Sequence, residues 1–417
     1  MNIPQLSEKR RLPVLAIVAN SLPPYRMHLH QRIAREMAGE IIMHTVCTHE
    51  VDYMHAYAPT PDIKAISFGP GHPFTRQLKL RYAPFEWLKA GRIIKWFESN
   101  QVDAVLVLGY NDVGRIRILR WCHSRGVPSL LFGDSNIRGD TAIGLKAAFK
   151  NVVVGWIVRQ VTALMVCGRL GREYWQKYGA HTERLFDFPY EPDYELIRAL
   201  PLKKIEEVRQ RFNLRAERRR IVFSGRFAPA KCPDLLIDAF IALAHARPEW
   251  DLVFIGAGGV ALGGGDRGSL EARVPDELKG RVVFTGFLEE QWMVSAIYRA
   301  SDVLCLPSEF EPWALVVNEA AAAGMAIVAT NVVGAAAELV RDGVNGRVFP
   351  PRDLRALTEA LLDVTESDRI DVLRAGSADV LADWRRRGDP VNGLRMALKF
   401  AGVIRPAATA FSENHAA

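Results

Sequence analysis

The feature that most constrains the fold is a regular alternation of short apolar runs with helical patterns. The run LPVLAIV is followed by a helical pattern at about 25–37 and then by IIMHTV. The runs VDAVLVL and VPSLLF flank a second helical pattern at 112–125, and ALMVC continues the scheme. Short continuous apolar strands separated by helices predict a parallel sheet covered by helices on both faces.

The same alternation starts again near residue 220. The predicted strands are RIVFSG, DLVFIG, RVVFTG, DVLCLP and MAIVAT, and the predicted helices are 233–246, 290–299, 314–323 and 354–364. The stretch 201–220 between the two arrays is dense in charged residues and is predicted to be a helix and linker. We therefore predict an α/β protein with two Rossmann-like doubly wound domains that face a central cleft.

The length of 417 residues suits two domains of about 150–200 residues each. We expect the first domain at 1–195 and the second at 196–380, with a C-terminal helix at 384–402 returning to complete the first. In other proteins with this type of domain, ligands bind beyond the carboxyl ends of the strands. The loops after the strands are therefore the first place to look for a site.

Cysteine use and hydropathy bear on the cellular compartment. The five cysteines lack metal-ligand or redox spacing, and those in apolar runs are expected to be buried free thiols, which favours a reducing compartment. The N-terminal apolar run is short and has no small-residue cleavage site after it, and the stretch 152–167 is interrupted by Arg159 and Gln160. We expect a cytoplasmic protein, with peripheral contact to the cytosolic face of the membrane as the alternative.

The net charge of +7 is compatible with nucleic acid, anionic lipid or phosphorylated small molecules as partners. Nothing beyond this charge points to nucleic acid, and none is expected as a partner.

The segment SEFEPWALVVNEAAAAG, residues 308–324, carries the most chemistry. A strand ends just before it, a polar loop holds Glu311, and the helix that follows holds Glu319. The N–H groups at the start of such a helix suit phosphate or sugar oxygens. Carboxylates beside them accept hydrogen bonds from the vicinal hydroxyls of ribose and hexose. The alternative, a surface helix residue, suits Glu319 poorly because its neighbours are small and apolar.

A second candidate lies in SGRFAPAKCPD, residues 224–234. A strand ends at Gly225, Arg226 follows, and Lys231 precedes a helix. Two cations at a strand-to-helix turn would neutralise a diphosphate leaving group. Exposed cations in loops are common, so this segment is only suggestive when taken alone.

Together with FIGAG, VVFTGFL and VGAAAELVRDGVNGRVFP, these segments resemble the C-terminal domain of retaining glycosyltransferases of family 4, which have the GT-B fold. The resemblance covers roughly 220–365 and includes the family's E-x7-E pair, here Glu311 and Glu319, in a subgroup variant that reads EPW. It implies that Arg226 and Lys231 bind the donor diphosphate, that Glu319 holds the ribose, and that Glu311 contacts the donor sugar. It also implies further donor contacts from Gly225, Phe287, Leu288, Pro312, Trp313, Ala314 and Leu315.

The activity implied is transfer of a hexosyl unit from a nucleoside diphosphate sugar to a hydroxyl acceptor, with retention of configuration and an acceptor hydroxyl that attacks from the leaving-group side. Surface polysaccharide or glycolipid synthesis, with a lipid-linked acceptor, is the expected setting. No metal motif is present in the sequence, and no cofactor is expected besides the sugar nucleotide as co-substrate.

One residue departs from the family pattern, because Ala314 stands where glycine is usual. A methyl group there would crowd the sugar or require a different backbone angle, which leaves the donor sugar open. In the first half the resemblance is looser. Tyr25 and Arg26 fall in a loop expected near phosphate and acceptor, and 188–193 resembles the hinge. The histidine that many members have near the sugar has no clear counterpart, and 110–112 lies at about its place after a strand.

Two stretches predict a membrane-facing surface. Residues 74–97 mix Arg and Lys with Phe, Trp and Tyr, and Lys146, Lys150, Trp156 and Arg159 add to them. Amphipathic helices with their aromatic side chains in the core explain the pattern equally well.

Two other classes of function remain open from the sequence. One is a different enzyme, a sugar-nucleotide epimerase with a similar fold or a Rossmann dehydrogenase, against which the E-x7-E pair argues. The other is a sugar-nucleotide binding protein of the same fold with weak catalysis, for which Ala314 is the only hint.

Overall fold

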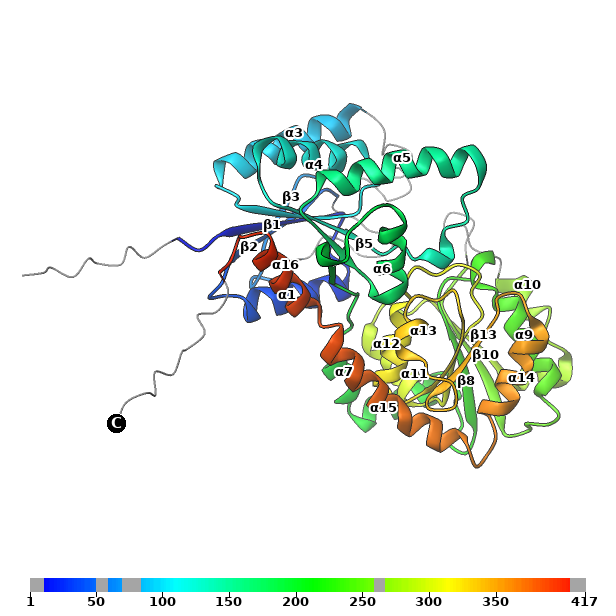
Figure 1. Cartoon of the computed structure of the whole chain (residues 1–417). Coiled ribbons are helices and arrows are strands. Elements are labelled where there is room, and N and C mark those ends of the chain that lie inside the picture. The colour runs from blue at the N-terminus through cyan, green and yellow to red at the C-terminus, as the bar shows by residue number, and fades with distance from the viewer. Residues whose placement is uncertain (1–10, 50–58, 70–83, 259–266, 406–417) are drawn as a thin grey trace, which may run out of the picture.

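The computed structural model describes residues 11–49, 59–69, 84–258 and 267–405. The described chain forms two lobes, each built on a parallel sheet with helices on both faces (Figure 1). The predicted pair of doubly wound α/β domains is confirmed.

The first sheet has seven strands in the order β3-β2-β1-β4-β5-β6-β7. They are β1 (Val14–Ala19), β2 (Ile42–Cys47), β3 (Lys64–Ser67), β4 (Ala104–Leu108), β5 (Ser129–Gly133), β6 (Ala163–Val166) and β7 (Leu185–Asp187). The strand order reverses between β1 and β4, and such a point is where doubly wound sheets bind ligands. Apart from the partly exposed edge strands, the strands are apolar and mostly buried because helices cover both faces.

One face of this sheet is covered by α1 (Pro24–Glu36) and the other by α3 (Pro84–Ser99), α4 (Val113–Arg125), α5 (Gly144–Gln160) and α6 (Gly168–Lys177). The helix α4 begins at the predicted place because the carboxylate of Asp112 accepts a hydrogen bond from the Arg115 N–H, at 2.8 Å. A short 3-10 turn, η1 (Ile137–Gly139), links β5 to α5.

The second sheet has six parallel strands in the order β10-β9-β8-β11-β12-β13. They are β8 (Arg219–Ser224), β9 (Trp250–Ile255), β10 (Val282–Gly286), β11 (Val303–Leu306), β12 (Ala326–Thr330) and β13 (Gly346–Phe349). Among the helices around it are α9 (Pro233–Leu243), α11 (Gln291–Arg299), α12 (Leu315–Ala322), α13 (Ala336–Leu339), α14 (Leu354–Val364) and α15 (Ile370–Arg387). The 3-10 turn η3 (Pro229–Lys231) precedes α9.

The charged stretch 201–220 is less of a linker than its composition suggested. It contains α8 (Leu202–Arg211), which buries Ile205 and Val208, and its last two residues already belong to β8. Arg220 is buried because its guanidinium donates to the carbonyl oxygen of Ala300, at 2.7 Å. The charge pattern alone does not predict this burial, because a buried arginine with backbone acceptors cannot be told from a surface arginine in the sequence.

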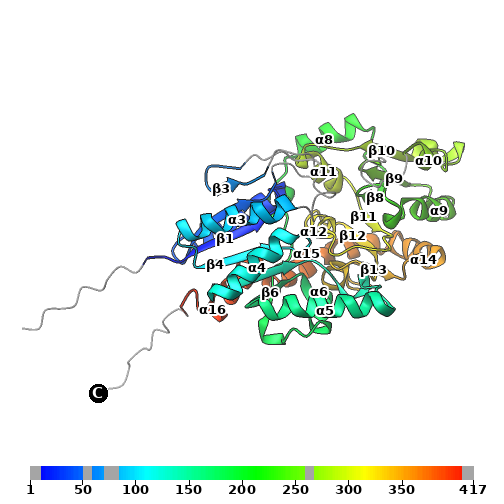
Figure 2. The ribbon, with the colours of Figure 1, turned by 90° about the horizontal axis from the view of Figure 1, so that it is seen from above.

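The C-terminal helix expected at 384–402 is two helices. The first, α15, ends at Arg387, and α16 (Pro390–Phe400) starts anew because Asp389 accepts a hydrogen bond from the Asn392 N–H at 2.7 Å. The helix α16 packs against the first sheet at β6 and β7, and Figure 2 shows it at the lobe of β1 and β4.

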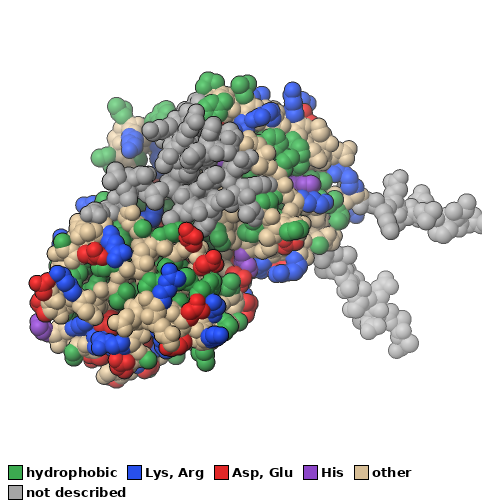
Figure 3. Space-filling model, turned by 180° about the vertical axis from the view of Figure 1, so that it is seen from behind, with side chains coloured by type: hydrophobic (Ala, Val, Ile, Leu, Met, Phe, Trp, Pro, Cys, Tyr) green, Lys and Arg blue, Asp and Glu red, His purple; other side chains and the backbone are tan. Residues whose placement is uncertain are grey.

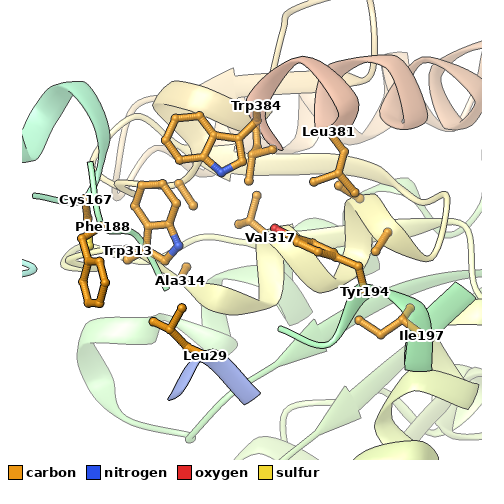
Figure 4. Close-up of a cluster of buried hydrophobic side chains, with 14 of the residues drawn as sticks. Leu29, Cys167, Phe188, Tyr194, Ile197, Trp313, Ala314, Val317, Leu381 and Trp384 are labelled. Carbon is orange, nitrogen blue, oxygen red and sulfur yellow. The ribbon is translucent and has the colours of Figure 1, made fainter. Parts of the chain in front are cut away.

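The two lobes share one hydrophobic cluster. Side chains from both sheets, from α1 and α12, and from α15 and α16 belong to it. Figure 4 shows its centre, where Trp313 faces Trp384 with ring centroids 5.5 Å apart, and Leu29 of α1 lies close by. This continuity holds the lobes in a defined arrangement around the cleft.

All five cysteines are buried and unpaired, as expected for those in apolar runs. Of the helices in the described ranges, none combines the length and the apolar composition needed to cross a bilayer.

Candidate functional site

Two cavities meet between the lobes at the carboxyl ends of the second sheet's strands. One of about 280 Å³ lies at the ends of β8, β9 and β10, and one of about 360 Å³ lies between α1 and α12. Pro24, Gln291 and Glu319 line both. We call the two together the interlobe cleft. Its position beside the strand-order reversal of the second sheet is where doubly wound folds bind ligands.

Two glycines make room for the smaller cavity. A Cβ on Gly256 would lie 2.0 Å from the carbonyl oxygen of Gly225, which is closer than any side chain tolerates. Gly256 also has a φ of +132°, which favours glycine. The ends of β8 and β9 can approach one another only because no side chain stands at this position.

Glu319 is buried in the wall of the cleft, with 7% of its surface exposed. Its Oε1 accepts a hydrogen bond from Nε2 of Gln291 at 3.1 Å, and the hydroxyl of Tyr298, which lies 2.6 Å from that of Ser224, is a second partner. Burial raises the pKa of Glu319 to about 7, although the bonds from Tyr298 and Gln291 lower it. A buried carboxyl with neutral partners has acceptor capacity left for ligand hydroxyls.

The other predicted glutamate, Glu311, forms an ion pair with Lys231. Lys231 is the last residue of η3, and Glu311 lies in the loop between β11 and α12. Burial, and the Arg226 guanidinium to a smaller extent, lower the pKa of Lys231 to about 8. The sequence therefore brings its predicted catalytic pair together across two loops.

Ala314 adopts the backbone conformation of a glycine. Its φ is +75° and ψ is +80° immediately before α12, which costs a residue with a Cβ about 1–2 kcal/mol. Its side chain is 8% exposed and belongs to the shared hydrophobic cluster (Figure 4). The loop thus keeps a conformation that glycine would also allow.

The side chain of the neighbouring Trp313 packs in the core and does not face the cleft. It is 1% exposed, and its indole N–H donates to Oδ1 of Asn318 at 3.0 Å. The carbonyl oxygen of Pro312 lies so close to Gly334 that a Cβ there would be 2.1 Å away. These contacts fix the loop between Glu311 and α12.

The predicted residues fall into two groups. The cleft is lined by Tyr25, Gly225, Arg226, Phe287, Leu288, Leu315 and Glu319. Outside that lining lie Arg26, Lys231, Glu311, Pro312, Trp313 and Ala314. The Arg26 guanidinium stays 5.8 Å from the Tyr25 ring, and Asp112, from the stretch 110–112, pairs with Arg115.

Several cleft residues were missed from the sequence. Gln291, Val294 and Tyr298 line the smaller cavity from α11. Their spacing of three and four residues places them on one helix face, so the helical pattern at 290–299 held a usable signal. Ser224 and Pro24 also line the cleft. The sequence pattern only located Ser224 at the end of a strand and Pro24 in the loop after the first strand.

Among the described residues, no group of three or more His, Cys, Asp or Glu side chains is arranged to hold a metal ion.

Part of the chain is similar in sequence to known proteins. Residues 204–376 match the family model described as glycosyl transferases group 1. The D-inositol 3-phosphate glycosyltransferase of Mycolicibacterium smegmatis is 32% identical over 168 residues, which are 40% of this chain and 37% of that protein. The lipopolysaccharide core biosynthesis mannosyltransferase LpsB of Rhizobium meliloti is 36% identical over 140 residues, 33% of this chain and 38% of that protein. The matches span about two fifths of these relatives.

Solved structures match over nearly the whole chain. The HepE protein of Anabaena in complex with UDP has a TM-score of 0.68 at 17% identity, covering 94% of this chain and 100% of that one. Sucrose-phosphate synthase of Thermosynechococcus elongatus has a TM-score of 0.70 at 16% identity, covering 93% and 99%. The fold is therefore GT-B.

Proposed function

We propose that this protein is a glycosyltransferase that moves a hexosyl unit from a nucleoside diphosphate sugar to a hydroxyl acceptor. The observation that carries the proposal is the interlobe cleft, which Arg226 and the buried carboxyl of Glu319 line, together with the ion pair of Lys231 and Glu311 in the neighbouring loops. The similarity of 204–376 to group 1 glycosyltransferases supports it. So does the UDP complex of HepE, which has the same fold.

In this proposal the second lobe binds the sugar nucleotide. The base would lie against Phe287 and Leu288, the ribose hydroxyls would bind the Glu319 carboxyl, and the diphosphate would lie at Arg226 and Lys231. The two cations would stabilise charge that develops on the leaving diphosphate, which is the largest single contribution in such reactions. No metal and no further cofactor is needed for this charge.

When a diphosphate pairs with Lys231 in place of Glu311, the Glu311 carboxylate would be available to contact the donor sugar. We propose transfer with retention, in which the acceptor hydroxyl attacks from the side of the leaving group and the diphosphate accepts its proton. Ala314 adopts a backbone conformation that is typical of glycine, so the loop at the start of α12 has the shape that a glycine there would give it. This supports an active enzyme over a binding protein. Tyr25 and Arg26 would lie on the acceptor and phosphate side.

The acceptor is proposed to be membrane-linked, and α5 is the surface that supports contact with a membrane. Its exposed large hydrophobic side chains, with that of the residue just before it, are Ile143, Leu145, Phe149, Val152 and Val153. The stretch 141–160 holds Lys146, Lys150 and Arg159 and no acidic residue. This composition suits an anionic lipid surface, and we propose a peripheral protein on the cytosolic face.

Part of the predicted membrane surface does not support it. Trp96, Phe97 and Trp156 pack on the core of the first lobe, while α3 exposes Phe85, Trp87 and Leu88. Residues 74–83 lie outside the described residues.

The test is release of nucleoside diphosphate from a panel of UDP- and GDP-sugars, with the sugar product examined by NMR. We expect Lys231→Ala and Glu311→Ala each to lower kcat by roughly 100-fold or more, while exposed Lys203→Ala keeps wild-type turnover. Free sugar or glycoside of the donor's anomeric configuration supports the proposal. A different epimer of the sugar nucleotide would identify an epimerase, and full activity in both variants would reject the site.

A further inference from the structure

The segment that follows β5 is where the first lobe touches the loop carrying Glu311. Asn136 in this segment is buried, with 4% of its surface exposed. Its amide nitrogen lies 2.9 Å from the carbonyl oxygen of Glu311, 3.1 Å from that of Pro312 and 3.2 Å from that of Val332. The two amide hydrogens are thus shared among three carbonyl oxygens of the other lobe.

The other end of the same amide holds the first lobe. Oδ1 of Asn136 accepts a hydrogen bond from the Gly139 N–H at 2.9 Å, which closes η1. The next residue, Asp140, accepts from Lys150 at 2.6 Å and from Lys177 and Tyr178 at 2.7 Å. Because three donors anchor this carboxylate to α5 and α6, the Asn136 amide reaches across the lobes from a fixed support.

Two further contacts continue the same interface. The ring of Phe310 packs so closely on Gly139 that a Cβ there would lie 2.5 Å from it. Oε1 of Glu338 accepts a hydrogen bond from the Arg169 N–H at 2.7 Å, in the first turn of α6. The contacts of Asn136, Phe310 and Glu338 form what we call the interlobe seam.

We propose that Asn136 is a positioning residue, which holds the backbone at 311–312 in the arrangement that sugar transfer requires, and only while the lobes are closed. This proposal rests on the proposed function. Two of the three carbonyl groups that it binds, those of Glu311 and Pro312, belong to the loop before α12, and the third, that of Val332, follows β12. Separation of the lobes would break all three bonds at once. The Glu319 side of the cleft does not contact Asn136, so nucleotide binding should not depend on it.

Two substitutions separate the two ends of the amide. Asn136→Asp keeps an acceptor for the Gly139 N–H but presents a carboxylate to three carbonyl oxygens, while Asn136→Ala removes both functions. We expect Asn136→Asp to lower kcat by about 10-fold or more, because the carbonyl groups lose their donor. The KM for the donor and the affinity for free nucleoside diphosphate should change less than about threefold. Asn392→Asp, the same change at an exposed site of α16, is the matched control.

A local role in the η1 turn predicts the opposite pattern. If Asn136→Ala were impaired and Asn136→Asp turned over like the wild type, the proposal would be overturned. If the wild type itself turned over no donor, the proposed function would fail, and small-angle scattering would then decide on the seam. We expect a larger radius of gyration for Asn136→Asp than for the wild type, and equal radii would reject the interlobe role.

Discussion

The two glutamates of the E-x7-E pair, Glu311 and Glu319, differ in their surroundings although they lie on one loop and the helix that follows it. Glu311 is paired with an ammonium group, whereas Glu319 has a neutral amide and a hydroxyl as partners. A buried carboxyl without a cation holds its proton more tightly, and this explains why burial dominates the pKa of Glu319. Ligand hydroxyl groups that donate hydrogen bonds to the charged carboxylate would lower this pKa.

The raised pKa of Glu319 predicts that the stability of the protein depends on pH. Folding raises its pKa from the ordinary 4.5 to about 7, so the folded state binds the proton more tightly and stability falls as pH rises through this range. Glu319→Gln is neutral at every pH. The free energy of unfolding of the variant minus that of the wild type should therefore increase by roughly 2–3 kcal/mol between about pH 5 and about pH 8. Urea titrations at both pH values measure this, and a constant difference would contradict it.

At the scale of elements, α5 differs from the other helices of the first lobe. Only its second half, with Val154, Ile157 and Val158, packs on the sheet, while its first turns project past the sheet (Figure 1). On the face seen from behind, which is not the face of α5, basic side chains lie on both lobes and acidic ones are more frequent on the second (Figure 3). A half-packed helix with exposed apolar side chains, basic residues and no acidic residue suits an anionic surface.

Membrane contact through α5 can be tested with two side chains. Leu145 and Phe149 are 91% and 72% exposed, so the double change Leu145→Ser and Phe149→Ser should leave the fold intact. We expect it to weaken the affinity for vesicles of phosphatidylglycerol and phosphatidylcholine, measured by sedimentation, by about 100-fold or more, since each side chain contributes about 1.5–3 kcal/mol when buried. Leu202→Ser, which is 78% exposed on α8, should bind like the wild type. Equal binding by all three proteins would reject this surface.

Much of the order of strands and helices could be predicted from the sequence, because strands that are buried on both faces consist of continuous apolar residues. The helix expected at 354–364 has those bounds in the structure, and the loop with Glu311 follows β11 as expected. The break before Pro390 was missed, since the helical pattern continues through it. Asn136 was missed because its three partners are backbone oxygens 175 or more residues away, and no local pattern encodes such a contact.

At the scale of the whole molecule, the lobes are tied together on two sides of the cleft. The seam closes one side. On the hinge side, Arg32 of α1 donates to Glu191 at 2.6 Å and to Asp389 at 2.9 Å. Because Asp389 also starts α16, one arginine connects the predicted hinge at 188–193 with the point where the chain returns to the first lobe. The shared cluster lies between these ties, so the lobes should unfold together.

The return of α16 depends on Gly393. A Cβ there would lie 1.7 Å from the carbonyl oxygen of Asp187 at the end of β7, so Gly393→Ala must push the helix off the sheet. We expect the wild type to unfold in one transition, with circular dichroism and tryptophan fluorescence coinciding. In the variant the loss of packing should lower stability by about 1–3 kcal/mol and separate the two transitions, because the first lobe loses part of its core. Gly280→Ala, where nothing lies within 4 Å of the added carbon, is the control. An unchanged single transition in Gly393→Ala would show that α16 does not couple the lobes.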